Sequence, residues 1–276
     1  MSNSDHLDSR FEFLQAVIQS AGQLVKSGFE TRVSNTFSMK GPQDYLTETD
    51  AASEAHVRDA LGKAFPQDSF FGEEGGGTIS GSVWVVDPVD GTANFARGVP
   101  HFCISIGYLL NGVPELAGIY NPVLGELYLA RRGKGATLNG KPIKVSNTAD
   151  YRAASVEMGW STRVPNARYL EVVTELLAIG FNVRRCGSGA LALAHVADGR
   201  SDAYVELHMN SWDCVPGMLI VEEAGGLVCP YLELGDLERG GPVLVASPAI
   251  AHGISSSAGI PVKTIDFKDI CDQAIA

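Results

Sequence analysis

The chain has 276 residues, 45% of them hydrophobic and 19% charged, and its formal net charge at pH 7 is −11. This length allows one large or two modest domains with sizeable cores. The acidic surplus argues against nucleic-acid binding, which needs clustered Lys and Arg, and against an anionic membrane surface as partner. No apolar run approaches the roughly 20 residues of a membrane span, and the first residues do not resemble a signal peptide. A cytoplasmic location is therefore expected.

The cysteines and histidines give no metal or disulfide pattern. The five cysteines are scattered and form no CxxC pair: Cys103, Cys186, Cys214, Cys229 and Cys271. This spacing favours idle or buried thiols in a reducing compartment over a zinc knuckle or a disulfide framework. The six histidines show no HExxH-type spacing.

Two helices are predicted near the N-terminus. Apolar residues recur at steps of three and four from Leu7 to Val25, which is typical of an amphipathic helix. A second helix fits residues 51–65, with Thr49 or Asp50 as its N-cap and Pro66 as its stop.

A buried strand and a series of hairpins follow. Val83–Val86 is continuously apolar, which indicates a strand buried on both faces. From about residue 103 to residue 143, β-rich stretches alternate with turn signals. The turns are Asn111-Gly112, Leu124-Gly125 and Asn139-Gly140.

The polar stretch from Ser146 to Arg152 is the predicted boundary between two halves. Residues 1–146 would form an N-terminal α+β subdomain that binds metal, and residues 147–276 a C-terminal α/β subdomain that completes the active site. In the second half the signals alternate, with helices over 165–179 and 190–197 and strands over 181–183, 202–206, 226–229 and 243–246. This alternation predicts a layered α/β (α+β) chain in two subdomains.

Another helix is predicted after Trp212. Proline lacks an N–H and is tolerated without a kink only in the first helical turn, so Pro216 places the N-cap at Asp213 or later. Asp213 would then lie at the mouth of the helix, with one carboxylate oxygen left for other interactions.

Two glycine patterns resemble nucleotide-binding motifs but lack the required context. Residues 187–192 match the G-x-G-x-x-A dinucleotide fingerprint, and Glu206 follows at about the expected spacing. That motif should end a hydrophobic first strand, whereas a polar pair of arginines precedes it here. Residues 135–141 match G-x-x-x-x-G-K, but Pro142 replaces the Mg²⁺-binding hydroxyl, and Asn139-Gly140 reads as a hairpin turn.

The segment from Asp87 to Thr92 carries the clearest chemistry. A buried strand delivers Asp87 and Asp90 to its C-terminal end, and Pro88 stiffens the turn between them. With the carbonyl of Val89, these carboxylates provide the hard oxygen ligands that Mg²⁺ prefers. Gly91 and Thr92 then open a helix whose free N–H groups can hold a phosphate.

More acids join this segment from elsewhere in the chain. Glu73 and Glu74 lie between an apolar pair and a glycine run, and Asp213 comes from the distant half. Converging carboxylates would repel one another unless divalent cations lay between them. The alternative is that these are separate surface acids and a capping aspartate.

These stretches together resemble the inositol monophosphatase family, a group of Mg²⁺-dependent, Li⁺-sensitive phosphatases. The resemblance lies in Gly72-Glu73-Glu74, in the run Asp87-Pro-Val-Asp-Gly-Thr-Ala-Asn-Phe95, and in Trp212-Asp213 followed by residues 222–226. It implies a layered αβαβα sandwich of two subdomains, like inositol monophosphatase and fructose-bisphosphatase, and a homodimer.

The resemblance also implies the ligands of two to three Mg²⁺ ions per active site. Glu73, Asp87 and the Val89 carbonyl would hold one ion. Asp87, Asp90 and Asp213 would hold a second, and a third would bind weakly near Glu73.

The same resemblance assigns the water and the substrate. Thr92, paired with Asp50, would orient and deprotonate the attacking water, with Glu74 as a helper. The substrate would contact the acidic ligands Glu73, Asp90 and Asp213. The Gly91 and Thr92 amides would hold phosphate oxygens, and the alcohol would face Gly187, Ser188, Gly189 and Glu206.

Two departures from the family pattern, and one difference from a single branch of the family, bear on the site. Val215-Pro216 replaces a pair of alanines and could reshape the helix beside Asp213. Gly189 stands where many relatives have alanine, which would widen the pocket. Ala93-Asn94 differs from the Lys-Glu of the 3′-phosphoadenosine phosphatase branch, so a nucleotide bisphosphate is not the expected substrate.

The expected function is hydrolysis of a small polyol phosphate, first of all myo-inositol monophosphate, by metal-activated water. Histidinol phosphate and fructose 1,6-bisphosphate are alternative substrates for the same chemistry. A regulatory binding protein on the same fold is the alternative from another class. Expected partners are the phosphorylated polyol and a second copy of the chain.

Overall fold

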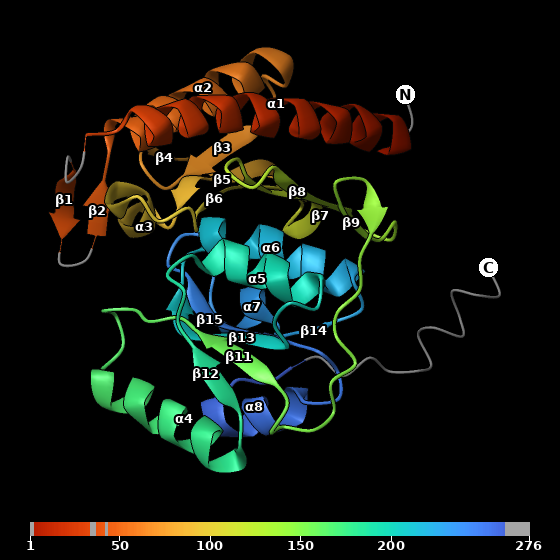
Figure 1. Cartoon of the computed structure of the whole chain (residues 1–276). Helices are drawn as coiled ribbons and strands as arrows, with labels where there is room; N and C mark the ends of the chain where they lie inside the picture. The colour runs from red at the N-terminus through yellow and green to blue at the C-terminus, as the bar shows by residue number, and fades with distance from the viewer. Residues whose placement is uncertain (1–2, 34–36, 42–43, 263–276) are drawn as a thin grey trace.

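The computed structural model describes residues 3–33, 37–41 and 44–262, which form five stacked layers (Figure 1). The first layer holds the long helices α1 (Asn3–Thr31) and α2 (Glu48–Ala64). Below it lie an eight-stranded sheet, a central helical layer, a five-stranded sheet, and an outer pair of helices. The predicted αβαβα sandwich is confirmed.

The eight-stranded sheet has the order β10-β9-β8-β7-β6-β5-β3-β4, and all its pairs are antiparallel except β3 with β5. Its strands are β3 (Ser69–Gly72), β4 (Gly76–Gly77), β5 (Ser82–Asp90), β6 (Cys103–Leu110), β7 (Val113–Asn121), β8 (Glu126–Arg131), β9 (Ala136–Leu138) and β10 (Lys141–Pro142). The Asn111-Gly112 and Asn139-Gly140 turns have positive φ at both residues, as the predicted tight hairpins require.

Strand β5 is buried on both faces, as predicted. Trp84 and Val86 pack with α1 and α2, whereas Val83 and Val85 pack into the central core cluster. Alternate residues of a strand point to opposite faces, so a continuous apolar run fits between two helical layers.

The second sheet has the order β12-β11-β13-β15-β14 and is mixed. Its strands are β11 (Ser155–Met158), β12 (Asn182–Arg184), β13 (Ala203–Met209), β14 (Leu227–Val228) and β15 (Gly241–Ala246). Between the sheets lie α5 (Gly189–Ala197) and α6 (Ser211–Glu223), and beyond the second sheet lie α4 (Asn166–Ile179) and α8 (Ala251–Ala258).

The remaining elements are short. β1 (Ser38–Gly41) and β2 (Asp44–Leu46) form a separate antiparallel hairpin near α3 (Thr92–Arg97), and α7 (Tyr231–Leu234) precedes β15. The two large sheets span residues 69–142 and 155–246, and one core cluster includes side chains from both. The division of the chain at residue 146 stays a prediction.

Strand β5 continues further than predicted. It runs through Pro88 to Asp90, with an irregular register against β6 between Asp87 and Asp90, so this segment is a bulged strand end and not a turn. A bulge tolerates proline because the ladder hydrogen bond is already interrupted there.

The predicted N-cap of α2 was wrong. The helix begins at Glu48, and Thr47 is its N-cap. Thr47 and Asp50 form a capping box, because the Asp50 carboxylate accepts the backbone N–H of Thr47 and the Thr47 side chain accepts the backbone N–H of Asp50. The Thr47 hydroxyl also donates to the Asp50 carboxylate. Asp50 is therefore a buried residue of the first turn.

The predicted start of α6 was also wrong. The helix begins at Ser211 with Asn210 as its N-cap, so Pro216 lies inside it. The ring fits against Gly107, where a Cβ would approach its Cγ to 3.0 Å. The carbonyl of Trp212, four residues before the proline, instead accepts a 3.0 Å hydrogen bond from the Ser105 hydroxyl. Asp213 nonetheless lies in the first turn, as expected.

The sequence analysis expected neither a membrane-spanning segment nor a disulfide framework. In the described segments no helix combines the length and the apolar character that crossing a bilayer requires. Of the cysteines, the four within these segments are free thiols, and Cys271 lies outside them.

Candidate active site

Three carboxylates from distant parts of the chain meet at the C-terminal end of β5. One side-chain oxygen from each of Asp87, Asp90 and Asp213 lies within 4.8 Å of the others. Asp87 and Asp90 come from the strand, and Asp213 comes from the first turn of α6. The predicted convergence of acids from the two halves is therefore present in the structure.

Asp90 has a second set of contacts that the sequence did not indicate. Its carboxylate accepts hydrogen bonds from the Ser188 hydroxyl and from the backbone N–H groups of Gly189 (3.3 Å) and Ala190 (2.8 Å). These donors belong to the N-terminus of α5, so Asp90 supplies the negative charge that a helix start favours. The supposed dinucleotide fingerprint begins here, and a protein carboxylate takes the place where a phosphate would bind.

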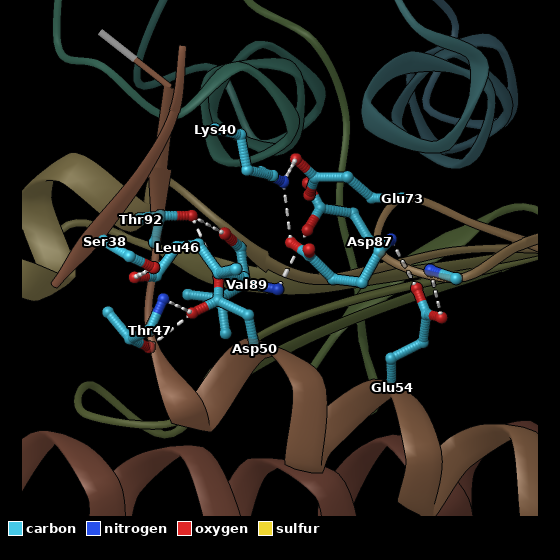
Figure 2. Close-up of polar contacts among 12 residues, drawn as sticks. Ser38, Lys40, Leu46, Thr47, Asp50, Glu54, Glu73, Asp87, Val89 and Thr92 are labelled. Atoms are coloured by element: carbon cyan, nitrogen blue, oxygen red, sulfur yellow. Dashed lines mark hydrogen bonds and ion pairs between the residues drawn. The ribbon is translucent and has the colours of Figure 1, made fainter.

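A turn between β3 and β4 carries Glu73 and Glu74 toward this cluster (Figure 2). The Lys40 ammonium reaches them from β1, at 3.2 Å from Glu73 Oε1 and 2.9 Å from Glu74 Oε1. The turn is tied down by Glu54 of α2, whose carboxylate accepts the N–H groups of Glu74 and Gly75, both at 2.8 Å. Lys40 and Glu54 were not among the predicted site residues.

Thr92 and Asp50 lie side by side, as the resemblance implies. The Thr92 hydroxyl lies 3.0 Å from Asp50 Oδ1 and 2.9 Å from the Val89 carbonyl oxygen, and can donate its proton to either (Figure 2). Asp87 accepts the N–H of Val89 at 2.8 Å, which fixes the bulge. Gly91 adopts φ +96° before α3, and a Cβ there would lie 3.1 Å from both Ser188 Cβ and the His101 carbonyl oxygen.

The electrostatics of the cluster favour a bound cation. Burial, together with the neighbouring carboxylates, raises the pKa of Asp87 and of Asp213 well above the ordinary range. Burial likewise raises the pKa of Glu73 to about 7 and that of Asp50 to about 6. Burial would lower the pKa of Lys40, but its attraction to Glu73 and Glu74 outweighs that effect and raises it.

The residues present fit a hard divalent cation. Oxygen ligands are gathered closely, their charges repel one another, and an ammonium group already sits against two of the acids. Carboxylate and carbonyl oxygens are the ligands of Mg²⁺ and related ions.

Comparison with known proteins decides the family. The pattern of the inositol monophosphatase family matches residues 6–257. The chain belongs to this family.

Relatives and solved structures agree with this assignment. The chain is 37% identical to Nus factor SuhB of Escherichia coli (strain K12) over 236 residues, which cover 82% of this chain and 88% of that protein. The inositol monophosphatase of Anabaena superposes with a TM-score of 0.79 at 34% identity, covering 93% of this chain and 98% of the other. SaIMPase-II with inositol monophosphate bound superposes with a TM-score of 0.74 at 30% identity, covering 89% and 92% of the two chains.

One pocket of about 520 Å³ opens over the acidic cluster of this family member. Every residue predicted to bind metal or substrate lines it: Glu73, Asp87, Val89, Asp90, Gly91, Thr92, Gly187, Ser188, Gly189, Glu206 and Asp213. Asp50 and Glu74 are not among the residues that line this pocket, and their catalytic roles stay predictions.

The pocket also has lining residues that the sequence analysis missed. They are Tyr45, Arg97, Glu157, Trp160, Arg185 and Cys186 among others. Arg185 and Cys186 precede the glycine pattern directly, but Arg185 was considered only as evidence against a nucleotide motif and Cys186 only as one of the scattered cysteines. No residue spacing in the sequence connects Trp160 with them.

Proposed function

We propose that this member of the inositol monophosphatase family is a Mg²⁺-dependent phosphomonoesterase that hydrolyses a small polyol phosphate, with myo-inositol monophosphate as first candidate. The meeting of Asp87, Asp90 and Asp213 at the floor of the pocket carries the proposal. Glu73, Asp87 and the Val89 carbonyl would bind one ion, and the three aspartates a second. A third ion would bind near Glu73.

When bound, divalent cations neutralise the phosphate and the leaving oxygen and acidify water. Without them the acidic pocket of a chain with net charge −11 repels a dianionic substrate. The chain's contribution is therefore to gather the ligands and to hold the phosphate in line with the attacking water.

Thr92 and Asp50 are placed to handle the proton of that water. The Thr92 hydroxyl accepts a hydrogen bond from water while donating its own proton to Asp50 Oδ1, 3.0 Å away. Burial raises the pKa of Asp50 to about 6, close to that of a group that exchanges protons near neutral pH. Glu74, which accepts a hydrogen bond from Lys40 and donates its backbone N–H to Glu54, would assist.

Gly91 and Thr92 would receive the phosphate, because the first amides of a helix lack intrahelical acceptors. The alcohol would lie between the loop 187–189 and Glu206. Ser188 and Gly189 already donate to Asp90, so they would shape this wall mainly by contact. The bound ligand of SaIMPase-II supports a phosphorylated polyol as substrate.

The test measures phosphate release from inositol, sugar, nucleotide and histidinol phosphates, with Mg²⁺ or with excess EDTA. We expect hydrolysis that EDTA abolishes, and a loss of at least about a hundredfold in Asp213→Asn, which removes one charged ligand. Asp59→Asn, an exposed acid on α2 paired with Lys63, is the matched control and keeps full activity. Hydrolysis that survives both EDTA and Asp213→Asn would contradict the proposal.

The Escherichia coli relative is named Nus factor SuhB, and this name supports a second candidate function, in which the chain binds a protein partner as well as catalysing hydrolysis. If the Asp213→Asn variant loses hydrolysis but still binds the same protein partner as the wild type, the binding role is separate from hydrolysis.

We also propose that the chain forms a homodimer, for which light scattering should give twice the mass of the chain.

A further inference from the structure

A second cavity of the molecule, of about 640 Å³, shares no lining residue with the catalytic pocket. It lies beside the linker that follows β10, where the Val145 N–H donates a 3.1 Å hydrogen bond to the Ala224 carbonyl at the end of α6. We call this cavity the linker groove, and the proposed function makes no use of it. Its apolar lining includes Ala136, Pro142, Ile143, Val145, Ala224 and Pro248.

The chain around the linker groove is basic, in contrast to the molecule as a whole. Residues 127–149 contain five basic residues and no acid, whereas the whole chain has 21 basic and 32 acidic residues. The two arginines of this stretch pair with carboxylates. Its lysines, Lys134, Lys141 and Lys144, are exposed and form no ion pair with any carboxylate that the structure describes. An apolar groove with such lysines at its rim fits an occupant that is both apolar and acidic.

One acid lines the linker groove, and its carboxylate is already bound. Glu223 accepts the backbone N–H groups of Gly133 and Gly135, both at 2.7 Å. These bonds tie the turn after β8 to the end of α6 and so fix one wall of the groove. The lysine charges are therefore left for an occupant.

The sequence that follows the last described residue has the matching chemistry. Residues 263–276 lie outside the described part of the chain, and their sequence has a helical pattern. Apolar residues recur there at steps of three and four, at Phe267, Ile270, Cys271, Ala274 and Ile275. Residues 266–275 contain three aspartates and one lysine, a net charge of −2. The pattern predicts a helix with one apolar face and acidic flanks.

Helix α8 leads the chain back toward the linker groove. The turn just before α8 lines the groove. After α8, Gly259 adopts φ +70° and the Ser255 hydroxyl donates a 2.7 Å hydrogen bond to the Ile260 carbonyl, so the chain folds back on the helix. Val262 then packs against the same core cluster as the apolar residues of the linker. Residues 263–265 can span a further 10 Å or so, roughly 3.3 Å for each extended residue.

We propose that residues 266–275 bind the linker groove as an amphipathic helix, with the apolar face against the groove and with Asp266 and Asp272 toward its lysines. Anchors spaced at three, four and seven residues are how such a helix fills a groove. Because the segment belongs to the same chain, its effective concentration at the groove is high, and a weak contact suffices to keep it bound. The inference is independent of hydrolysis, so it can fail while the proposed function stands.

Cys271 allows a test in the full chain. Asn147 is exposed and lines the groove, so Asn147→Cys should form a disulfide with Cys271 when copper–phenanthroline oxidises the thiols. Asp59→Cys, at an exposed position of α2 outside the groove, is the matched control. We expect the disulfide to form at least about tenfold faster in Asn147→Cys, because docking holds its two thiols together.

Peptide mapping identifies the disulfide. Trypsin releases residues 145–152 and 269–276 as separate peptides, each with one of the two cysteines, unless a disulfide joins them. A non-reducing gel shows whether the disulfide lies within one chain or joins two. Equal rates in the two cysteine variants would overturn the inference. A disulfide found only between two chains would also overturn it, since the occupant would then be a second copy.

The apolar face is tested by two neighbouring substitutions. Ile270→Asp places a charge in the middle of this face and should reduce the rate in Asn147→Cys to that of Asp59→Cys. Asp269→Asn lies on the opposite face of the predicted helix and should leave the rate unchanged. A rate that is the same with and without Ile270→Asp would mean that the cysteines meet by chance collision.

The lysines and the undisturbed groove are tested separately. Lys144→Glu should slow the disulfide several-fold at low salt and less at 1 M salt, where charges are screened beyond about 3 Å. Lys26→Glu, at an exposed position of α1, should have no effect. Without an added cysteine, backbone hydrogen exchange of residues 143–149 should be faster in Ile270→Asp than in the wild type. Equal exchange in these two proteins would leave the groove without this occupant.

Discussion

At the scale of single residues, Ser105 and Pro216 form a compensating pair. Pro216 removes a helical N–H, and the Ser105 hydroxyl satisfies the carbonyl of Trp212 in its place. Ser105→Ala leaves this carbonyl without a donor, and both Ser105 and Pro216 are fully or nearly fully buried. We expect the free energy of unfolding of Ser105→Ala to be ~1–3 kcal/mol lower than that of the wild type, measured by denaturant titration.

A double-mutant cycle checks the cause. Pro216→Ala supplies a backbone N–H four residues after Trp212, so Ser105→Ala should cost much less in the Pro216→Ala background. Additive losses in the cycle would mean that the serine stabilises the protein by packing alone.

The same residues show where sequence reasoning fails at this scale. The rule that proline lies in the first helical turn placed the start of α6 too late. The rule does not foresee that a hydroxyl from a distant strand, that of Ser105 on β6, can satisfy the carbonyl that the proline leaves without its N–H. Asp50 looked like a cap because acids favour helix starts, but the preceding Thr47 takes that position and Asp50 completes the capping box. The bonds of Asp90 to α5 depend on packing between the two halves, which no local pattern encodes.

At the scale of elements, α2 positions the turn that carries Glu73 and Glu74. The carboxylate of Glu54 is buried and accepts two backbone N–H groups of that turn (Figure 2). It also accepts a hydrogen bond from the Arg58 guanidinium. Glu54→Gln replaces one carboxylate oxygen by an NH₂ group, which cannot accept a hydrogen bond from the backbone N–H that it would face. We expect the Mg²⁺ concentration for half-maximal activity to rise several-fold, with a smaller change in activity at saturating Mg²⁺, because the ligands are displaced and not removed.

Arg58→Met is the matched control for Glu54→Gln. It removes the ion pair of Glu54 but leaves both backbone hydrogen bonds, so its Mg²⁺ dependence should stay near that of the wild type. Equal Mg²⁺ dependence in Glu54→Gln and the wild type would show that the turn holds its shape without Glu54.

Helices and hairpins were largely predictable because their signals are local. The helix that ends before Gly180 is confirmed, and that glycine adopts φ +115°. The bulge at Pro88 was interpreted as a turn, because Asp-Pro and Asp-Gly are turn signals wherever the register of a partner strand is unknown.

At the scale of the whole molecule, the acidic cluster joins the layers. Asp87 and Asp90 belong to the first sheet and Asp213 to the central helical layer, so repulsion among them acts between elements that the core holds together. The sequence allowed this meeting to be predicted from charge chemistry and family resemblance. It did not reveal the rim of the pocket, because Trp160 and Arg185 come together only through the parallel pairing of β11 with β12, which the two residues follow in the chain.

This arrangement predicts how stability depends on pH and metal. The pKa of Glu73 is raised to about 7, and those of Asp87 and Asp213 are raised well above their ordinary values. A carboxyl group with a raised pKa in the folded state contributes stability at low pH, which is lost as the pH rises from about 4 to about 7. The Tm of the metal-free protein should therefore be lower at pH 8 than at pH 5.5. This difference in Tm should be smaller in Asp213→Asn, which removes one of these charges.

Mg²⁺ should reverse this loss, because a cation that binds the ionised cluster stabilises only the folded state. At a hundredfold excess over its Kd the gain is ~2.7 kcal/mol, or several degrees in Tm for a chain of this size. The gain should be larger at pH 8 than at pH 5.5, where protons compete for the same oxygens. Scanning calorimetry with Mg²⁺ or EDTA at both pH values measures it, with Asp59→Asn as control. If the rise in Tm on adding Mg²⁺ is the same at both pH values, or is as large in Asp213→Asn as in the wild type, the ion binds elsewhere.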